Sequence, residues 1–188
     1  MHDADDETLM LAYRDGDASA FDVLYQRHRQ RLFHFLVRKT GSRETGEELY
    51  QEAWLRLIRH HRDYQPSARF TTWLFTLAHH RMVDHWRTHK AHASLDAETE
   101  EGAALADTLA AASGFGPERR LDSREQAQAL LDALAALPAA QREAFLLQAE
   151  AGMSVAEIAQ ATGVPLETAR SRLRYARAQL RTALESFA

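Results

Sequence analysis

The chain has 188 residues, no cysteine and a formal net charge of −4, and 45% of its residues are hydrophobic. This length allows one domain or two small ones, and the lack of cysteine excludes disulfides, thiolate zinc sites and thiol redox sensing. No segment approaches the roughly 20 apolar residues of a membrane span, and no signal peptide is visible at the acidic N-terminus, so we expect a cytoplasmic protein without membrane insertion.

Charge is distributed unevenly along the chain. Residues 1–92 carry 14 Lys and Arg against 13 Asp and Glu, residues 93–122 carry 2 against 7, and residues 123–188 carry 7 against 7. Within the last segment, residues 165–188 hold five Arg against two Glu. Local patches of charge decide where a protein contacts DNA. The modest total charge predicts that the chain alone binds DNA weakly and needs a partner.

The spacing of apolar residues predicts an all-α fold. No window has the period-two alternation of a strand flanked by turn residues. A loop that contains Pro66 is expected over 63–69, and in the first half helices are expected over 9–13, 18–38, about 44–61 and about 71–89. The third of these helices is predicted to turn five residues inward: Leu49, Ala53, Trp54, Leu57 and Ile58.

Residues 93–122 differ from the rest in composition. They are rich in Ala, Glu, Asp and Gly and contain little to bury, which is typical of a flexible acidic linker. Helical periodicity resumes near Ser123 and breaks at Pro138. The sequence therefore predicts two small helical domains, 1–92 and 123–188, joined by this linker.

A helix-turn-helix is predicted in the second domain. Ser154 and Glu157 form a capping-box pattern, so a helix should start at Val155, and Gly163 and Pro165 suit the turn and the next helix. That helix has an apolar face and an arginine face: Leu166, Ala169, Leu173, Ala176 and Leu180; Arg170, Arg174, Arg177 and Arg181. Such a helix suits the major groove of DNA, with an ordinary solvated face as the alternative.

Aromatic and basic side chains alternate in the first domain between residues 62 and 87. Aromatic rings stack on unpaired bases while cations hold the backbone of single-stranded DNA, and an extruded base needs such a pocket. Burial in the core is the alternative, and for Trp73 and Trp86 the two readings weigh equally. The group contains Tyr64, Phe70, Trp73, Phe75 and Trp86 with Arg62, Arg69, Arg81 and Arg87.

Four motifs follow one another along the chain. They are Glu47-Glu48-Leu49-Tyr50-Gln51-Glu52-Ala53-Trp54; Trp73-Leu74 with Leu77-Ala78, His80, Asp84 and Arg87; Leu137-Pro138 with Arg142 and Phe145; and Glu167-Thr168-Ala169-Arg170-Ser171-Arg172-Leu173. With these motifs the chain resembles the bacterial RNA polymerase sigma factors of the extracytoplasmic-function (ECF) group, in the sigma-70 superfamily. The resemblance covers about residues 9–90 and 123–184 and leaves the linker unmatched.

The resemblance implies a sigma factor that binds core RNA polymerase and directs promoter-specific transcription initiation. The first domain would read and melt the −10 element, the second would read the −35 element as duplex, and an anti-sigma factor would be a further partner besides polymerase and promoter DNA. The implied site residues are, for core polymerase, Glu47, Glu48, Gln51 and Glu52; for −10 DNA, Tyr64, Arg69, Phe70, Trp73, His80, Arg81 and Arg87; and for −35 DNA, Thr168, Arg170, Ser171, Arg174 and Arg177.

Two residues depart from the family pattern. His80 stands where the family usually has Asn, and an imidazole lacks the paired donor and acceptor of an amide, which favours a different −10 base. Glu167 stands where the family usually has Gly, and there its charge favours the helix dipole, with acceptance of a hydrogen bond from cytosine N4 as the alternative.

Two other functions stay open. A stand-alone helix-turn-helix regulator would have no use for the aromatic group, and a sigma mimic that titrates an anti-sigma factor could lose the arginines that are present here. No phosphate loop, no nucleophile with its base and no metal cluster is visible, so we expect no enzyme activity, cofactor or metal. His85 and His89 share a helix face, but two histidines alone make a weak metal site, and we expect the histidines to be solvated or DNA-facing.

Overall fold

The computed structural model describes residues 4–92 and 117–185, which form helices and connections without a strand. This confirms the all-α prediction. Across these described ranges, no helix is long and apolar enough to cross a membrane. The elements are α1 (Asp6–Arg14), α2 (Ala18–Thr40), α3 (Arg43–His60), the single turn η1 (His61–Asp63), α4 (Phe70–His92), α6 (Pro117–Ala136), α7 (Ala139–Ala151), α8 (Val155–Thr162) and α9 (Leu166–Leu184).

The helices of the first half begin at local capping signals. The side chains of Asp5, Asp17 and Ser42 accept hydrogen bonds from backbone N–H groups in the first turns of α1, α2 and α3. Gly41, with φ of 72°, ends α2 in the left-handed conformation that glycine adopts without strain. The expected helices of this half are therefore present, with ends shifted by a few residues.

The first helix of the second half begins inside the range predicted for the linker. Helix α6 begins at Pro117, so residues 117–122 are helical, and the remaining linker residues 93–116 lie outside the described residues. Proline is favoured at the first position of a helix because it has no N–H to leave unpaired there. Composition averaged over 93–122 does not show that Pro117 marks the start of a helix.

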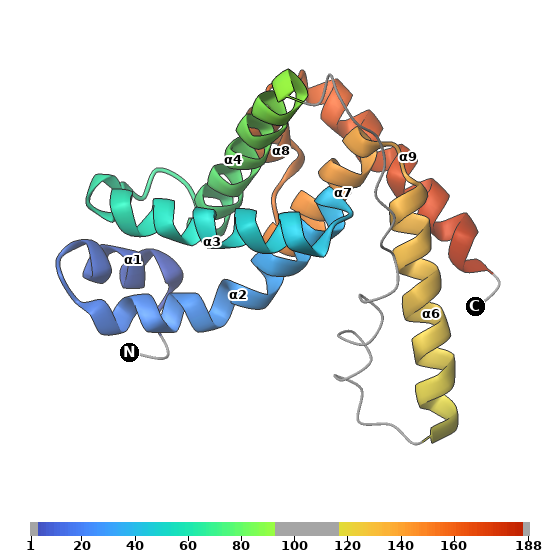
Figure 1. Cartoon of the computed structure of the whole chain (residues 1–188), viewed down its shortest axis with the longest axis horizontal. Helices are drawn as coiled ribbons and strands as arrows, with labels where there is room; N and C mark the ends of the chain where they lie inside the picture. Colours follow the sequence, from blue (N-terminus) through green and yellow to red (C-terminus); the bar gives the residue numbers. More distant parts are fainter. Residues whose placement is uncertain (1–3, 93–116, 186–188) are drawn as a thin grey trace.

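The helices are arranged around the contacts of α7 (Figure 1). Helices α1, α2 and α3 pack together at one end, and α4 packs on α3 and reaches α7 and α8. Helix α7 contacts both α2 and α9, and α6 packs on α9. The second half is thus in direct contact with the first, an arrangement that the sequence prediction of two small domains joined by a linker left open.

One continuous apolar core joins the two halves. It contains fully buried rings of the first half, such as Phe35, Phe70 and Phe75, and side chains of α7 to α9 such as Leu147 and Ile158. A second cluster of Leu134, Leu137, Ala176 and Leu180 holds α6 on α9.

Two residues of the predicted apolar faces are exposed. Ile58 near the end of α3 is 38% exposed, and Leu166 at the start of α9 is 44% exposed. Helical spacing identifies the face of a helix, but neighbouring helices do not cover these two ends.

Candidate nucleic-acid interface

The helix-turn-helix forms as its sequence signals indicate. The Ser154 hydroxyl accepts a hydrogen bond from the Glu157 N–H at 3.3 Å, and the Glu157 carboxylate accepts one from the Ser154 N–H at 2.8 Å, which completes the capping box. Gly163 has φ of 66° at the end of α8, and α9 begins at Leu166 after Pro165. The predicted turn and both helix starts are confirmed.

Helix α9 separates an apolar face from an arginine face. Ala169, Leu173, Ala176 and Leu180 are buried. The opposite side exposes Arg170, Arg174 and Arg177, which line one surface hollow together with Val155 and Arg181. A row of guanidinium groups on a helix that is packed on its other side can contact phosphates and base edges in the major groove.

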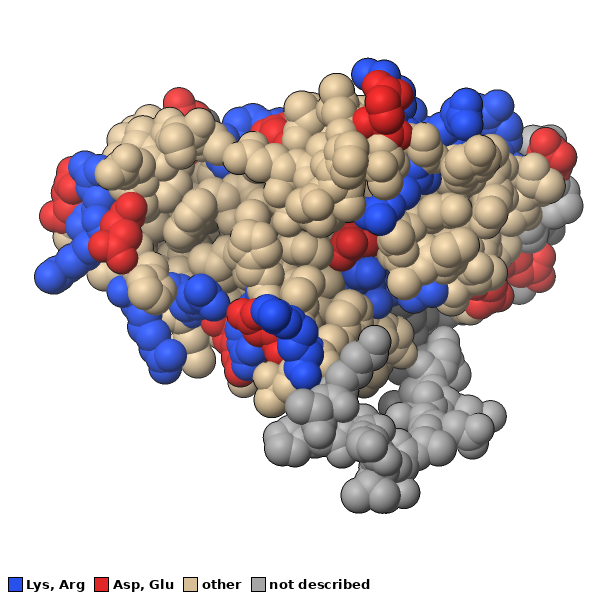
Figure 2. All heavy atoms as spheres, turned by 90° about the horizontal axis from the view of Figure 1, so that it is seen from above, with Lys and Arg blue, Asp and Glu red and all other residues tan. Residues whose placement is uncertain are grey.

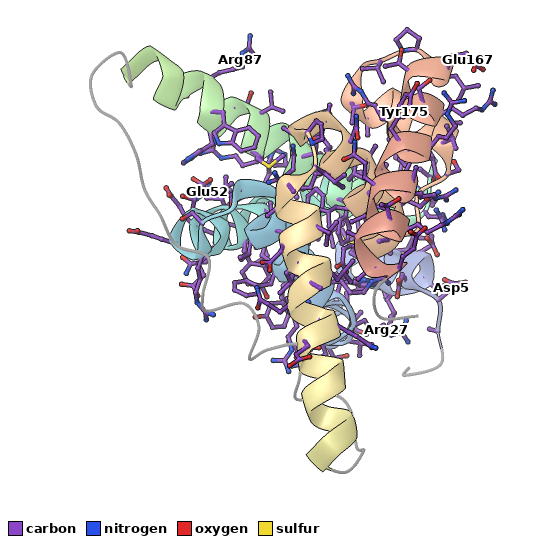
Figure 3. All side chains as sticks on the ribbon, turned by 90° about the vertical axis from the view of Figure 1, so that its right-hand side faces the viewer. Asp5, Arg27, Glu52, Arg87, Glu167 and Tyr175 are labelled. Carbon is purple, nitrogen blue, oxygen red and sulfur yellow. The ribbon has the colours of Figure 1, made fainter. Side chains whose placement is uncertain are left out.

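Contacts within α9 orient several of these side chains. Glu167 accepts a hydrogen bond from Arg170, and the Ser171 hydroxyl donates to the Glu167 carbonyl at 2.8 Å. Arg177 donates to the Gln148 side chain of α7, while Thr168 is half-buried. Glu167 thus holds Arg170, a role in addition to the two considered from the sequence. Figure 3 shows Glu167 and Tyr175 projecting outward from α9.

The aromatic group between residues 62 and 87 divides into buried and exposed rings. Tyr64 and Phe70 are 2% and 0% exposed and lie in the core, so neither ring faces solvent in this conformation. Trp73 is half-buried, with its ring centroid 5.2 Å from that of Tyr64. Trp86 is 37% exposed, beside the Lys39 ammonium. The core interpretation therefore holds for Tyr64, Phe70 and the fully buried Phe75, and the exposed interpretation for Trp86.

The N-terminus of α4 is held by α1. The backbone N–H of Phe70 donates to the Glu7 carboxylate at 2.6 Å. Burial, and then the nearby carboxylates of α1, raise the pKa of the Tyr64 phenol to about 12. These contacts fix the loop that precedes α4, and no sequence motif indicated that α1 would supply them.

The basic residues predicted for −10 DNA also divide into two groups. Arg69 donates to the Gly152 carbonyl at 2.6 Å, and Arg81 pairs with Glu52, with 2.7 Å between Nε and Oε2. His80 and Arg87 are exposed, and Arg87 projects from the outer part of α4 (Figure 3). Three of the four are thus exposed, since the Arg69 side chain is 54% exposed, while Arg69 and Arg81 also have partners within the chain.

The acidic residues predicted for polymerase binding share the outer face of α3. Glu47, Glu48 and Gln51 are exposed, and Glu52 is partly covered by Arg81. Two large apolar residues continue this face, Leu55 at 48% exposure and Ile58 at 38%. Sequence spacing identified the acidic part but not the apolar extension, because Ile58 was assigned to the core.

Three histidines are buried, which corrects the expectation of solvated or DNA-facing positions. His28 lies 2.7 Å from the Asp6 carboxylate, His79 lies 2.9 Å from that of Glu143, and His85 is 7% exposed. Among the residues that the structure describes, no three or more of His, Cys, Asp and Glu are grouped to hold a metal ion. The side chain of His89 lies outside that description.

Charge is dispersed over the face that Figure 2 shows. Seen from above, the face is largely uncharged, with Lys and Arg in small separate groups that alternate with Asp and Glu (Figure 2). A surface of this kind gives weak long-range attraction to DNA.

Comparison with known proteins places both halves in one family. The model of Sigma-70 region 2 matches residues 24–92, and that of Sigma-70, region 4 matches residues 127–180. The RNA polymerase sigma factor CarQ of Myxococcus xanthus is 35% identical over 163 residues, which cover 87% of this chain and 88% of CarQ. The ECF RNA polymerase sigma factor SigM of Mycobacterium tuberculosis (strain ATCC 25618 / H37Rv) is 32% identical over 180 residues, which cover 95% of this chain and 84% of SigM.

Two solved structures share the fold. The sigma factor RpoE in complex with the anti-sigma factor NepR, from Bartonella quintana, aligns with a TM-score of 0.65 and 19% identity over 89% of this chain and 98% of that one. CnrH in complex with the cytosolic domain of CnrY aligns with a TM-score of 0.62 and 23% identity over 97% and 99%.

Proposed function

The chain belongs to the ECF group of the sigma-70 family, and from this membership we propose which of its surfaces carry out promoter-directed transcription initiation. Residues 24–92 are called region 2 below, and residues 127–180 region 4. Region 2 binds core polymerase and the −10 element, and region 4 binds the −35 element. The covalent chemistry belongs to the polymerase, and the working place is the cytoplasm, where polymerase and promoter DNA are found.

The exposed arginine face of α9 carries this proposal. Arg170 and Arg174 reach base edges or phosphates of the −35 duplex, and Arg177 reaches a phosphate. Thr168 and Ser171 are the polar residues of the same helix at its DNA-facing end. The support is that this row is exposed on a helix whose other face is buried from Ala169 to Leu180.

The outer face of α3 is the proposed polymerase contact. Its carboxylates and Gln51 meet basic side chains of the polymerase, and Leu55 and Ile58 add apolar area beside them. Specific complexes commonly combine apolar and polar residues in one interface.

In region 2 the −10 element is bound by the exposed residues of α4. His80, Arg87 and the half-buried Trp73 are positioned for this contact, and Arg69 and Arg81 join when their internal partners release them. Tyr64 and Phe70 act from the core by supporting Trp73. An anti-sigma factor is a further proposed partner, supported by the solved complex of RpoE with NepR.

Runoff transcription with purified core polymerase tests the proposal. We expect specific transcripts from promoters of the source genome that disappear when core is omitted or when Arg170 and Arg174 are both replaced by Ala. Absence of both transcripts and core binding would instead favour a stand-alone regulator or a sigma mimic.

A further inference from the structure

Helix α1 precedes the residues that the Sigma-70 region 2 model matches, which begin at residue 24. It nevertheless contacts both η1 and α4, the two elements on either side of the segment that joins α3 to α4. The exposed part of this segment, residues 65–69, is called the connecting loop below, and the buried Tyr64 and Phe70 flank it. A helix outside the matched residues therefore packs beside both ends of this loop.

Glu7 of α1 holds the C-terminal end of the connecting loop. Its carboxylate accepts a hydrogen bond at 2.6 Å from the backbone N–H of Phe70, the first residue of α4. Arg69 precedes α4 but cannot act as its N-cap, because a guanidinium has no hydrogen-bond acceptor. A carboxylate at this place also interacts favourably with the helix dipole. Glu7 thus supplies, from 63 residues away in the chain, the acceptor that Arg69 lacks.

The ring of Phe70 is supported through the residue that precedes Glu7. Asp6 lies 2.7 Å from Nε2 of His28 on α2, and the His28 ring packs beside that of Phe70 with 5.3 Å between their centroids. The other Asp6 oxygen accepts a hydrogen bond from Arg27 at 2.7 Å. Two consecutive residues at the start of α1 therefore bind the backbone of Phe70 and the histidine that packs against its ring.

The last turn of α1 holds the N-terminal end of the connecting loop. The Tyr13 ring lies 4.6 Å from that of His61 in η1, centroid to centroid, and Arg14 donates a hydrogen bond to the Tyr64 carbonyl at 3.5 Å. Both ends of the loop are thus attached to one helix. Attachment at both ends reduces the number of conformations that the exposed residues between them can adopt.

We propose that α1 positions the connecting loop for the unpaired strand of the −10 element, with Glu7 as the positioning residue. The loop leads directly into the first turn of α4, which contains the half-buried Trp73 proposed above to contact that element. A loop that is already held in its binding conformation loses less conformational entropy when DNA binds. The inference rests on the proposed function, because that function supplies the DNA.

Hydrogen exchange measured by mass spectrometry tests whether Glu7 holds the loop in the free chain. Glu7→Ala removes the acceptor of the Phe70 amide, so peptides that contain this amide should exchange faster than in the unsubstituted chain. Glu7→Gln keeps an oxygen acceptor and should restore slow exchange. Asp22→Ala, at an exposed position of α2, removes a carboxylate away from the loop and serves as the control.

Binding of unpaired DNA tests the consequence for the −10 element. The complex with core polymerase is titrated with two fluorescent single strands, one with the −10 sequence of a promoter identified by runoff transcription and one with that sequence scrambled. If the released loop is in place in one molecule in five, Glu7→Ala binds the −10 strand about fivefold more weakly, and Glu7→Gln restores the affinity. Affinity for the scrambled strand and for core should not change, whereas a general loss of stability would lower both.

Thermal melting by circular dichroism shows whether Glu7→Ala is folded at the assay temperature. If it is not, Arg14→Ala replaces it, because this substitution releases the Tyr64 end of the loop and should weaken binding of the −10 strand in the same way.

Equal discrimination between the two strands by the unsubstituted chain and the variants would overturn the proposal, and so would faster exchange without a loss of discrimination. Failure of the proposed function would be seen elsewhere, in an unsubstituted complex that does not distinguish the strands. The exchange measurement on the free chain would still show whether Glu7 holds the loop.

Discussion

The Glu157 carboxylate takes part both in the capping box of α8 and in the contact with α4. Burial alone would raise the pKa of this carboxyl, but hydrogen bonds from Thr72 and Ser154 and the charge of Arg69 lower it from 4.5 to about 2. A carboxyl with a lowered pKa stabilises the fold fully above its ordinary pKa, and that contribution is lost as the pH falls toward the lowered one.

We therefore predict a stability difference that depends on pH. The free energy of unfolding of Glu157→Gln should lie below that of the unsubstituted chain at about pH 6, and the gap should narrow between about pH 4.5 and pH 3. Urea denaturation at a series of pH values measures it. A gap that stays constant over this range would show that the carboxyl is not held in its charged form.

Arg174 is exposed on α9 and donates to the Tyr175 hydroxyl at 3.2 Å. If it contacts a phosphate or a base of the −35 duplex, Arg174→Ala lowers affinity for promoter DNA and reduces the slope of log affinity against log salt by about one. Binding of the polymerase complex to promoter DNA over a salt series measures this slope. The matched control is Arg29→Ala, at an exposed position of α2, and a slope equal to the control would exclude the contact.

Single residues also show where sequence reasoning stops. Tyr64 and Phe70 were predicted to contact DNA because stacking and core packing use the same aromatic side chains, and only the structure shows that both rings lie in the core. By contrast, Ser154, Glu157 and Gly163 act through the adjacent backbone, so their pattern specified the turn correctly.

At the scale of the helices, Gly46 sets how closely α2 and α3 approach. A Cβ at this position would lie 2.6 Å from Val37 Cγ2 and 2.9 Å from Val37 Cα. Alanine is the better helix former by about 1 kcal/mol at an open site, but here it would force the two backbones apart. We predict that Gly46→Ala lowers the free energy of unfolding by about 1–3 kcal/mol.

Urea denaturation measures the effect of Gly46→Ala, with Gln51→Ala as a control at an exposed site of the same helix. A neutral or stabilising result would mean that α2 and α3 are not in close contact at this point.

The outer face of α3 gives a prediction for polymerase binding. Glu48 and Gln51 are exposed and have no role in the core. Glu48→Ala with Gln51→Ala should weaken binding to core polymerase about tenfold, as truncation of central interface residues does, without a change in the melting temperature. Fluorescence titration with core measures it, with Glu44→Ala on the same helix as the control. Unchanged affinity would show that core polymerase binds another surface of the chain.

At the scale of the whole molecule, the packing of the two halves on each other could not be predicted from the sequence. Glu143 and Glu150 have the polar character of solvent-facing positions, and their partners lie about a hundred residues away in the chain. Helical periodicity reports which face of one helix is buried, but not which other helix buries it. The all-α class, the helices of the first half and the helix-turn-helix were therefore predictable, whereas the α2–α7 and α4–α8 contacts were not.

A continuous core has a thermodynamic consequence for the free protein. Because buried side chains of regions 2 and 4 belong to one cluster, we predict a single cooperative unfolding transition in differential scanning calorimetry, with calorimetric and van't Hoff enthalpies that agree. Two separate transitions would show that the regions fold independently. In that case the contacts through α7 would contribute little to stability.

The position of α7 limits how the parts of this chain can be exchanged. This helix supports α9 from one side and meets Lys39 and Arg38 of α2 from the other. A chimaera that takes its −35 specificity from a related chain, joined before α6, would also replace α7 with that of the related chain. Lys39 and Arg38 would then lose their carboxylate partners on α7. A graft confined to the outer residues of α9 keeps α7 native. Promoter preference is thus interchangeable at the level of one helix face, but not of a whole domain.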